Sequence, residues 1–186
     1  MITNEYKKEL FDLHSRYSWG ITAGKYVGET LIAFLNLHPE IKTILDYGCG
    51  EGTLAPFIIS AGITDRKWAL YDPGVPEFSD EPTGRYDLVI TTDVLEHVEE
   101  IMLNKVLAHM RSLTGRFLFN EIACSYCNVK FGAGPYKGQD LHINLKVPDI
   151  WRQRLKHNDF KLIDSTPILR EERIRYRSIQ ERKNSE

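Results

Sequence analysis

Residues 44–55 read ILDYGCGEGTLA, and this stretch decides the fold of the 186-residue chain. Two aliphatic residues lead into an acid, and three glycines then stand at alternate positions: Gly48, Gly50 and Gly52. Glycine costs backbone entropy in regular structure, so three together indicate positive φ angles or main chain left bare for a ligand. The apolar run predicts a buried strand, and residues 53–61 predict a helix. A glycine-rich turn from strand to helix indicates a ligand-binding loop.

The composition is that of a globular domain with no special class of partner. Hydrophobic residues make up 42% and charged residues 27%, and the net charge is −2. That charge gives no overall attraction to nucleic acid or to acidic membranes. No stretch approaches the roughly 18 apolar residues of a membrane helix, and the N-terminus lacks the apolar core of a signal peptide. Three cysteines are too few for a disulfide framework, so a reducing, cytoplasmic location is expected.

Strands and helices alternate along the chain. Helices are predicted at 3–16, 25–37, 53–61, 93–113 and 148–157, and strands at 42–47, 67–72, 75–78, 86–92, 115–122, 160–165 and 173–180. This order predicts a doubly wound α/β fold: a mostly parallel sheet with helices on both faces and an antiparallel C-terminal edge strand. Ligands bind at the carboxyl ends of such strands. We expect one domain over 1–186, made of a helical cover (1–40), a ligand-binding half (41–122), and a lid loop with C-terminal strands (123–186).

The residues around the glycines restrict the choice of ligand. A dinucleotide pyrophosphate would meet the carboxylates of Asp46 and Glu51, which is electrostatically unfavourable. A phosphate-binding P-loop is excluded because no Gly-Lys-Ser/Thr follows. A ligand without phosphate that tolerates nearby acids fits better, and S-adenosylmethionine (SAM) meets that description with its sulfonium, amino-acid end, ribose and adenine.

From about residue 41 to 165 the sequence resembles the class I SAM-dependent methyltransferases, which have a Rossmann-like fold. "LDYGCGEG" is similar to their first motif, Asp72 matches the acid that binds the ribose hydroxyls, and "YDLVITTDVLEHV" resembles the strand and helix start that close over the cofactor. The resemblance implies these cofactor-binding residues: Asp46, Gly48, Cys49, Gly50, Gly52, Asp72, Thr92 and Asp93. Only 13 residues separate Asp72 from Tyr86, so the usual third strand and its helix must be shortened. The adenine contact is left open, with Asp80 and Glu81 as candidates.

Two acceptor classes lack their motifs. The Asn/Asp-Pro-Pro-aromatic motif of amino-group DNA and protein methyltransferases is absent after "VITTDVL". The Pro-Cys nucleophile of cytosine-C5 enzymes is absent from the same place.

A group of acids and histidines follows the strand at 86–92 instead. Asp93, Glu96 and His97 stand at i, i+3 and i+4, so on a helix they share one face. Some ubiquinone-pathway O-methyltransferases and small-RNA 2′-O-methyltransferases hold a divalent metal with an acid-x-x-Glu-His set and a later histidine. His142 stands in a comparable place. The resemblance therefore implies a catalytic group, and with it a Mg²⁺, Mn²⁺ or Zn²⁺ site that lowers the pKa of the acceptor hydroxyl, made of Asp93, Glu96, His97 and His142.

The same residues have alternative interpretations that use no metal. His97 or His142 would act as a general base or contact the substrate. Asp93 as N-cap with Glu96 at the third helical position would form a capping box, which is a purely structural role.

Three further segments have competing interpretations. The loop 123–141 is a candidate lid whose Tyr126, Phe131 and Tyr136 would stack on a planar acceptor, while its cysteines, Cys124 and Cys127, lack the partners of a zinc knuckle. "RYSWG" (16–20) is either a second cover or simple packing. In the tail, an alternating strand would place Arg173, Arg175 and Arg177 on one face, either as a phosphate-binding stripe or as a solvated edge strand.

Together these features predict a SAM-dependent methyltransferase that acts on a small-molecule acceptor, at oxygen rather than nitrogen or carbon. Methylation of RNA or of a nucleotide at the 2′-oxygen is one alternative. A SAM-binding module that has lost its chemistry and works through a partner is the other.

Overall fold

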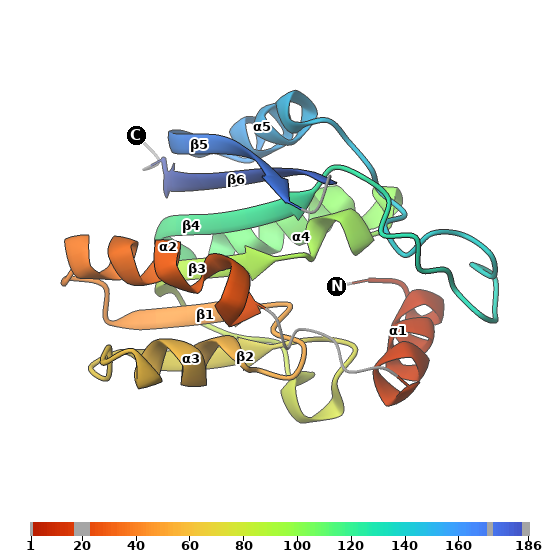
Figure 1. Cartoon of the computed structure of the whole chain (residues 1–186), viewed down its shortest axis with the longest axis horizontal. Coiled ribbons are helices and arrows are strands. Elements are labelled where there is room, and N and C mark those ends of the chain that lie inside the picture. Colours follow the sequence, from red (N-terminus) through yellow and green to blue (C-terminus); the bar gives the residue numbers. More distant parts are fainter. Residues whose placement is uncertain (1, 17–22, 171–172, 184–186) are drawn as a thin grey trace.

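The computed structural model describes residues 2–16, 23–170 and 173–183, and its centre is a six-stranded sheet (Figure 1). The strands are β1 (Thr43–Tyr47), β2 (Lys67–Tyr71), β3 (Tyr86–Thr92), β4 (Thr114–Ala123), β5 (Phe160–Arg170) and β6 (Arg173–Arg182). Their order is β2-β1-β3-β4-β6-β5. The first four are parallel, and β6 is antiparallel to both β4 and β5. The expected α/β class and the mostly parallel sheet are confirmed.

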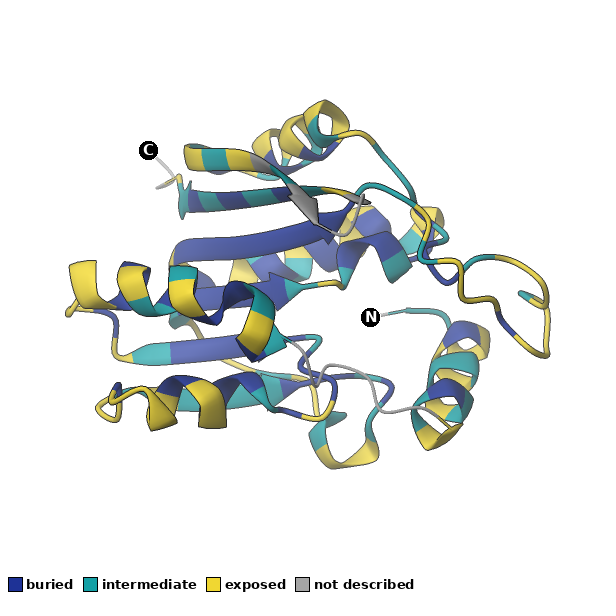
Figure 2. Cartoon of the chain, in the orientation of Figure 1, coloured by how far each residue is buried: buried dark blue, intermediate teal, exposed yellow. Residues whose placement is uncertain are grey.

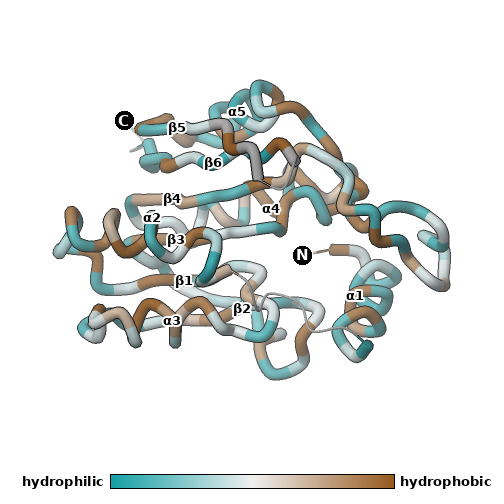
Figure 3. Tube along the Cα trace, in the orientation of Figure 1, coloured by the Kyte–Doolittle hydropathy of each residue, from teal (hydrophilic) through white to brown (hydrophobic). Residues whose placement is uncertain are grey.

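Helices cover both faces of this sheet. The elements are α2 (Ala23–Leu37) and α3 (Leu54–Ser60) on one face, and α4 (Glu100–Leu113) and α5 (Pro148–His157) on the other. Because side chains alternate along a strand, Ile44 of β1 belongs to the core on the side of α2 and α3, while Leu45 belongs to the core on the side of α4 and α5. Figure 2 shows β3 and β4 buried along most of their length. Figure 3 shows that hydrophobic residues recur along these central strands and along α2 and α3. The burial of both faces explains the continuous apolar runs in the sequence.

Helix α1 (Asn4–Arg16) does not lie on the sheet. It packs with the loop that follows β4, beyond the carboxyl ends of the parallel strands (Figure 1). The shared apolar cluster contains Tyr6, Leu13, Phe131 and Leu141. The segment predicted as a second cover, "RYSWG", lies mostly in residues 17–22, outside the described residues. None of the helices in the described part of the chain has the length and hydrophobicity needed to cross a bilayer.

Two predicted elements are wrong. Residues 76–78 form the 3₁₀ turn η1 (Pro76–Phe78) instead of a strand, so β2 is an edge strand. The helix expected at 93–113 is interrupted: Asp93 has a φ of 55°, η2 (Leu95–His97) is a single 3₁₀ turn, and α4 begins only at Glu100. Helical spacing therefore does not govern how Asp93, Glu96 and His97 point.

The C-terminal strand lies inside the sheet. β6 pairs with β4 on one side and with β5 on the other, and β5 is the outer strand. A solvated edge strand is therefore the wrong interpretation of the arginine-rich tail. The tail forms β6, which lies beside the parallel strand β4.

Candidate functional site

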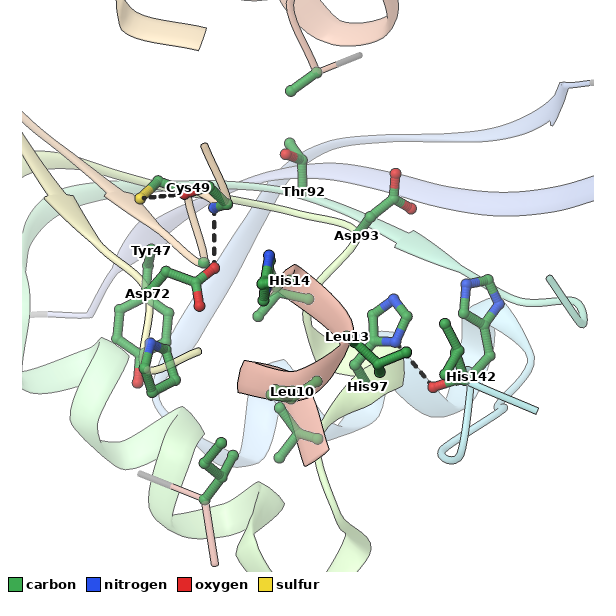
Figure 4. Close-up of a pocket in the computed structure, with 18 of the residues that line it drawn as sticks. Leu10, Leu13, His14, Tyr47, Cys49, Asp72, Thr92, Asp93, His97 and His142 are labelled. Carbon is green, nitrogen blue, oxygen red and sulfur yellow. Dashed lines mark hydrogen bonds between the residues drawn. The ribbon is translucent and has the colours of Figure 1, made fainter. Parts of the chain in front are cut away.

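One cavity of about 350 Å³ lies at the carboxyl ends of the parallel strands (Figure 4). Its walls come from three parts of the chain. The glycine loop and Asp72 form one side, the segment from Thr92 to Val98 with His142 forms the other, and α1 lies over both. Figure 4 shows Cys49 and Asp72 on one side, His97 and His142 on the other, and His14 of α1 between them. The structure thus brings together most of the residues predicted from sequence.

The glycine loop has the geometry that its sequence predicts. Gly48 and Gly50 have φ angles of 83° and 54°. A Cβ on Gly48 would stand 2.3 Å from Cγ2 of Val94, so no larger residue fits there. Asp72 fixes the loop, because its carboxylate accepts hydrogen bonds from the Gly50 amide (2.9 Å) and from the Gly74 amide (2.8 Å). Asp72 is both a wall of the cavity and the support of the loop.

Several predicted contacts of this loop are used internally. The amides of Gly48 and Cys49 both donate to the carbonyl of Tyr71, so the Cys49 amide is not available to a ligand in this way. Gly52 supports the turn by donating to the Cys49 carbonyl and is not a wall of the cavity. Thr92 lines the cavity. The two candidates for the adenine contact, Asp80 and Glu81, do not line it.

Asp46 is the most perturbed acid of the cavity wall. Its side chain is buried, and burial together with the charge of Asp72 raises its pKa from 3.8 to about 7. Burial disfavours the ionised form, and a second carboxylate nearby adds to the effect. A cationic group in the cavity would stabilise the ionised form of Asp46.

This shift predicts how stability depends on pH. Between pH 3.8 and about 7, the unfolded chain carries Asp46 ionised and the folded chain carries it protonated, so stability falls as pH rises. Asp46→Asn cannot ionise and removes this penalty. We expect its free energy of unfolding, relative to the unaltered protein, to rise by about 2 kcal/mol between pH 5 and pH 8 in urea denaturation. Asp65→Asn, at an exposed ion pair with Lys42, is the control and should show no such rise. A constant difference for Asp46→Asn would contradict the shift.

His97 and His142 form a pair at the other end of the cavity. Their ring centroids are 4.9 Å apart. Nδ1 of His97 lies 2.9 Å from the Leu141 carbonyl oxygen, and Nδ1 of His142 lies 2.6 Å from that of Ser125. A carbonyl only accepts, so each Nδ1 carries the hydrogen and each neutral ring keeps a lone pair on Nε2. Burial lowers both pKa values, and with the neighbouring His142 it lowers that of His97 to about 4.

Glu96 lies beneath this pair and does not line the cavity. It is fully buried; one carboxylate oxygen accepts from the Ala123 amide at 2.7 Å, and the other, Oε2, has no hydrogen-bond partner among the described residues. Burial and the nearby Asp93 raise its pKa well above the ordinary value. Glu96 therefore joins η2 to the end of β4. Asp93 makes no capping box with it, because no α-helix begins there.

Asp93 turns away from the histidines toward Arg175 of β6, with which it forms an ion pair. Glu121 of β4 is buried and binds Arg177 at 2.5 Å, and Arg175 approaches it at 3.7 Å. Arg177 also donates to the Thr30 hydroxyl. Arg175, which also lines the cavity, and Arg177 thus pair with carboxylates, which argues against a phosphate-binding stripe made of these two arginines. The side chain of Arg173 lies outside the described residues.

Metal-ligating atoms converge at two places among the described residues. One ligand atom each from Glu96, His97 and His142 lie within 4.8 Å of one another, and a second such group is Cys127, Asp140 and His142. In the second group the Asp140 carboxylate already accepts hydrogen bonds from the backbone amides of Cys127, Asn128 and His142. These bonds hold the loop after β4 together. In the first group, Glu96 Oε2 has no hydrogen-bond partner among the described residues. Asp93, the fourth predicted ligand, belongs to neither.

The sequence predicted a helical cover over residues 1–40, but not that α1 supplies residues of the site. Tyr6, Leu10 and His14 recur at intervals of four residues and line the cavity, so the apolar stripe of this helix faces the ligand site and not the sheet. His14 also reaches the turn after β2, where its Cδ2 would stand 3.0 Å from a Cβ on Gly74. Of the three lid aromatics, Phe131 lines the cavity, Tyr136 packs on Tyr6, and Tyr126 is exposed.

A family model described as a methyltransferase domain matches residues 19–165. The chain belongs to this family. The match spans the glycine loop, Asp72 and the histidine pair, and with the fold it places the chain in the class I SAM-dependent methyltransferase superfamily. The protein is an enzyme of the methyltransferase class. No curated protein sequence matches the chain.

Solved structures of other proteins have the same fold. Magnesium protoporphyrin IX methyltransferase from Synechocystis PCC 6803 with bound SAM is 17% identical, with a TM-score of 0.68, and the match covers 97% of this chain and 99% of that one. 1,6-Didemethyltoxoflavin-N1-methyltransferase from Burkholderia thailandensis is 14% identical (TM-score 0.63, covering 99% and 92%). Human N-acetylserotonin methyltransferase is also 14% identical (TM-score 0.61, covering 96% and 57%).

Proposed function

We propose that this methyltransferase transfers the methyl group of SAM to a hydroxyl oxygen of a small aromatic molecule. The observation that carries the proposal is one cavity with a glycine loop and two acids at one end and two neutral histidines at the other. In this proposal Gly48 and Gly50 leave room for the cofactor, Asp46 binds the ammonium group of its amino-acid end, and Asp72 binds the ribose. The acceptor lies between the cofactor and the histidines.

The transfer is an in-line displacement that depends chiefly on alignment of the acceptor with the sulfonium. The hydroxyl proton must also leave, and Nε2 of His97 or His142 accepts it as general base. Burial makes these imidazoles weak bases, as the pKa of about 4 for His97 shows. A weak base suits a phenol, whose pKa is about 10, better than an aliphatic alcohol, which holds its proton far more tightly.

Two of the proteins with the same fold are named for small molecules, magnesium protoporphyrin IX and 1,6-didemethyltoxoflavin, and the second name gives N1 as the position. We infer a ring-containing acceptor for this chain as well. Nitrogen is the natural competitor to oxygen.

The test is methyl transfer by the purified protein to matched sets of phenols, aliphatic alcohols and aromatic amines, read as S-adenosylhomocysteine (SAH) formed and as methylated product by mass spectrometry. We expect turnover with phenols. Turnover confined to amines would overturn the oxygen assignment. Binding of SAM without turnover on any set would favour the alternative of a non-catalytic SAM-binding module.

A metal-assisted form of the same reaction is the second candidate, favoured by the grouping of Glu96, His97 and His142. One ligand atom from each residue lies within 4.8 Å of those of the others, and Glu96 Oε2 has no hydrogen-bond partner among the described residues. A carboxylate with two imidazoles suits Mg²⁺, Mn²⁺ or Zn²⁺. Such an ion, when bound, supplies Lewis acidity that lowers the pKa of an acceptor hydroxyl. Asp93 is not in this group, and its carboxylate pairs with Arg175.

The metal form makes a separate prediction. If Glu96, His97 and His142 hold an ion, EDTA should reduce kcat at least tenfold, and a divalent ion should restore it. Glu96→Gln should then lower the affinity for Mn²⁺, measured by calorimetry, while SAM affinity stays within threefold. Turnover that resists EDTA leaves the histidines as metal-free bases.

The main argument for a nucleic-acid acceptor was an exposed row of arginines on the C-terminal strand. Arg175 and Arg177 instead form ion pairs with carboxylates of the protein. RNA added to the panel above tests this alternative, and methylation of RNA at a rate above that of phenols would restore it.

A further inference from the structure

Helix α1 is attached at both ends to the segments that form the cavity. At its first turn, the Glu99 carboxylate accepts hydrogen bonds from the amide and the hydroxyl of Thr3, both at 2.9 Å. Toward its last turn, the helix lies against the turn after β2, where a Cβ on Gly74 would stand 3.1 Å from Cβ of Leu10. The C-terminal half of α1 therefore lies next to the turn that contains Asp72.

His14 extends from this part of α1 into the cavity. Its side chain is half-buried and lines the cavity. Figure 4 shows its ring in the space between Asp72 and Asp93. The ring forms no hydrogen bond or ion pair with another described residue. Because an imidazole carries at least one N–H in either protonation state, His14 offers a donor to a molecule in the cavity.

The Asp72 carboxylate lies close to the His14 ring. The point at which a Cβ of Gly74 would stand is 3.0 Å from Cδ2 of His14 and 3.3 Å from Oδ1 of Asp72, so the two groups border the same small space. Nε2 of the imidazole is bonded to Cδ2 and lies at this edge of the ring. A hydroxyl between the two side chains would accept from the imidazole and donate to the carboxylate, each across about 2.8 Å.

We infer that His14 is a cofactor-binding residue whose imidazole donates a hydrogen bond to a ribose hydroxyl of the cofactor bound at Asp72. Helix α1 is then part of the cofactor site and not only a cover over it. This inference rests on the proposed function, which places the ribose at Asp72.

The test measures the affinities of SAH and 5′-methylthioadenosine (MTA) for the full chain by calorimetry. MTA keeps the ribose of SAH but lacks its amino-acid end. His14→Phe keeps a ring and removes both ring nitrogens, and we expect it to weaken SAH and MTA by the same factor, about five- to tenfold. His14→Gln carries an amide that donates from about the position of Nε2, so both affinities should stay within twofold of those of the unaltered protein.

Asp12→Ala is the matched control on the same helix. Asp12 pairs with Arg16 and does not line the cavity, so this variant should bind SAH and MTA as the unaltered protein does. Thermal unfolding shows whether each variant is folded at the temperature of the titration.

Three results would overturn the inference: unchanged SAH affinity in His14→Phe, the same loss in His14→Gln as in His14→Phe, or a loss for SAH that MTA does not share. Normal SAH binding without methyl transfer to any acceptor overturns the proposed function and leaves the role of His14 intact. A protein that binds neither SAH nor MTA overturns both.

Discussion

Asp72→Ala should weaken SAM binding at least tenfold in calorimetry at 15 °C. In the proposed mode the carboxylate loses its bonds to the ribose, and the amides of Gly50 and Gly74 lose the acceptor that holds the glycine loop. Hydrogen bonds to a charged partner contribute about 1.5–3 kcal/mol each, so the loss of even one accounts for a tenfold change.

A matched control separates this effect from general loss of an acid. Asp65 is an exposed aspartate that pairs with Lys42 on the surface, and Asp65→Ala should bind SAM as the unaltered protein does. Thermal unfolding of both variants shows whether Asp72→Ala is folded at the temperature of the titration. Unchanged SAM affinity in folded Asp72→Ala would remove Asp72 from the cofactor model.

His97→Asn should lower kcat by about 100- to 10,000-fold and leave SAM affinity within threefold. An asparagine amide reproduces the Nδ1 hydrogen bond to the Leu141 carbonyl but has nothing in place of Nε2. The substitution therefore removes the proposed base while keeping the contact that positions η2. The measurement is single-turnover methyl transfer to the best phenol, with SAM affinity measured in parallel.

The control for this prediction is His157, an exposed residue on α5 whose Nδ1 also lies close to a carbonyl, that of Gln153. His157→Asn should have normal kcat. If His97→Asn retains full activity, His142→Asn decides whether the second imidazole is the base. Full activity in both variants would exclude the histidine pair from proton transfer.

The sequence predicted most strands and helices and the glycine loop, because residues close together in the chain indicate each of them. The apolar run at 44–47 with its glycines defined β1 and the loop, and Pro148 marked the start of α5 correctly. The interval between Asp72 and Tyr86 showed that no full strand and helix fit between β2 and β3, and only the turn η1 stands there.

The positions of the side chains in the site were harder to predict from the sequence. The positive φ of Asp93 breaks the helix on which Asp93, Glu96 and His97 were expected to share a face. Glu96 then points beneath the cavity, and Asp93 pairs with Arg175, which is 82 residues away in the chain. No periodicity in one segment reports such a long-range ion pair.

Local pattern alone determined that this chain builds a parallel α/β sheet with a glycine-lined ligand loop, because strand length, helix period and glycine placement are properties of neighbouring residues. Tertiary structure alone decided which acids face the cavity, that two tail arginines pair with carboxylates, and that α1 lines the cavity. Those outcomes depend on which distant side chains meet at the carboxyl ends of the strands, where charge pairing and burial outweigh the preference of any single segment.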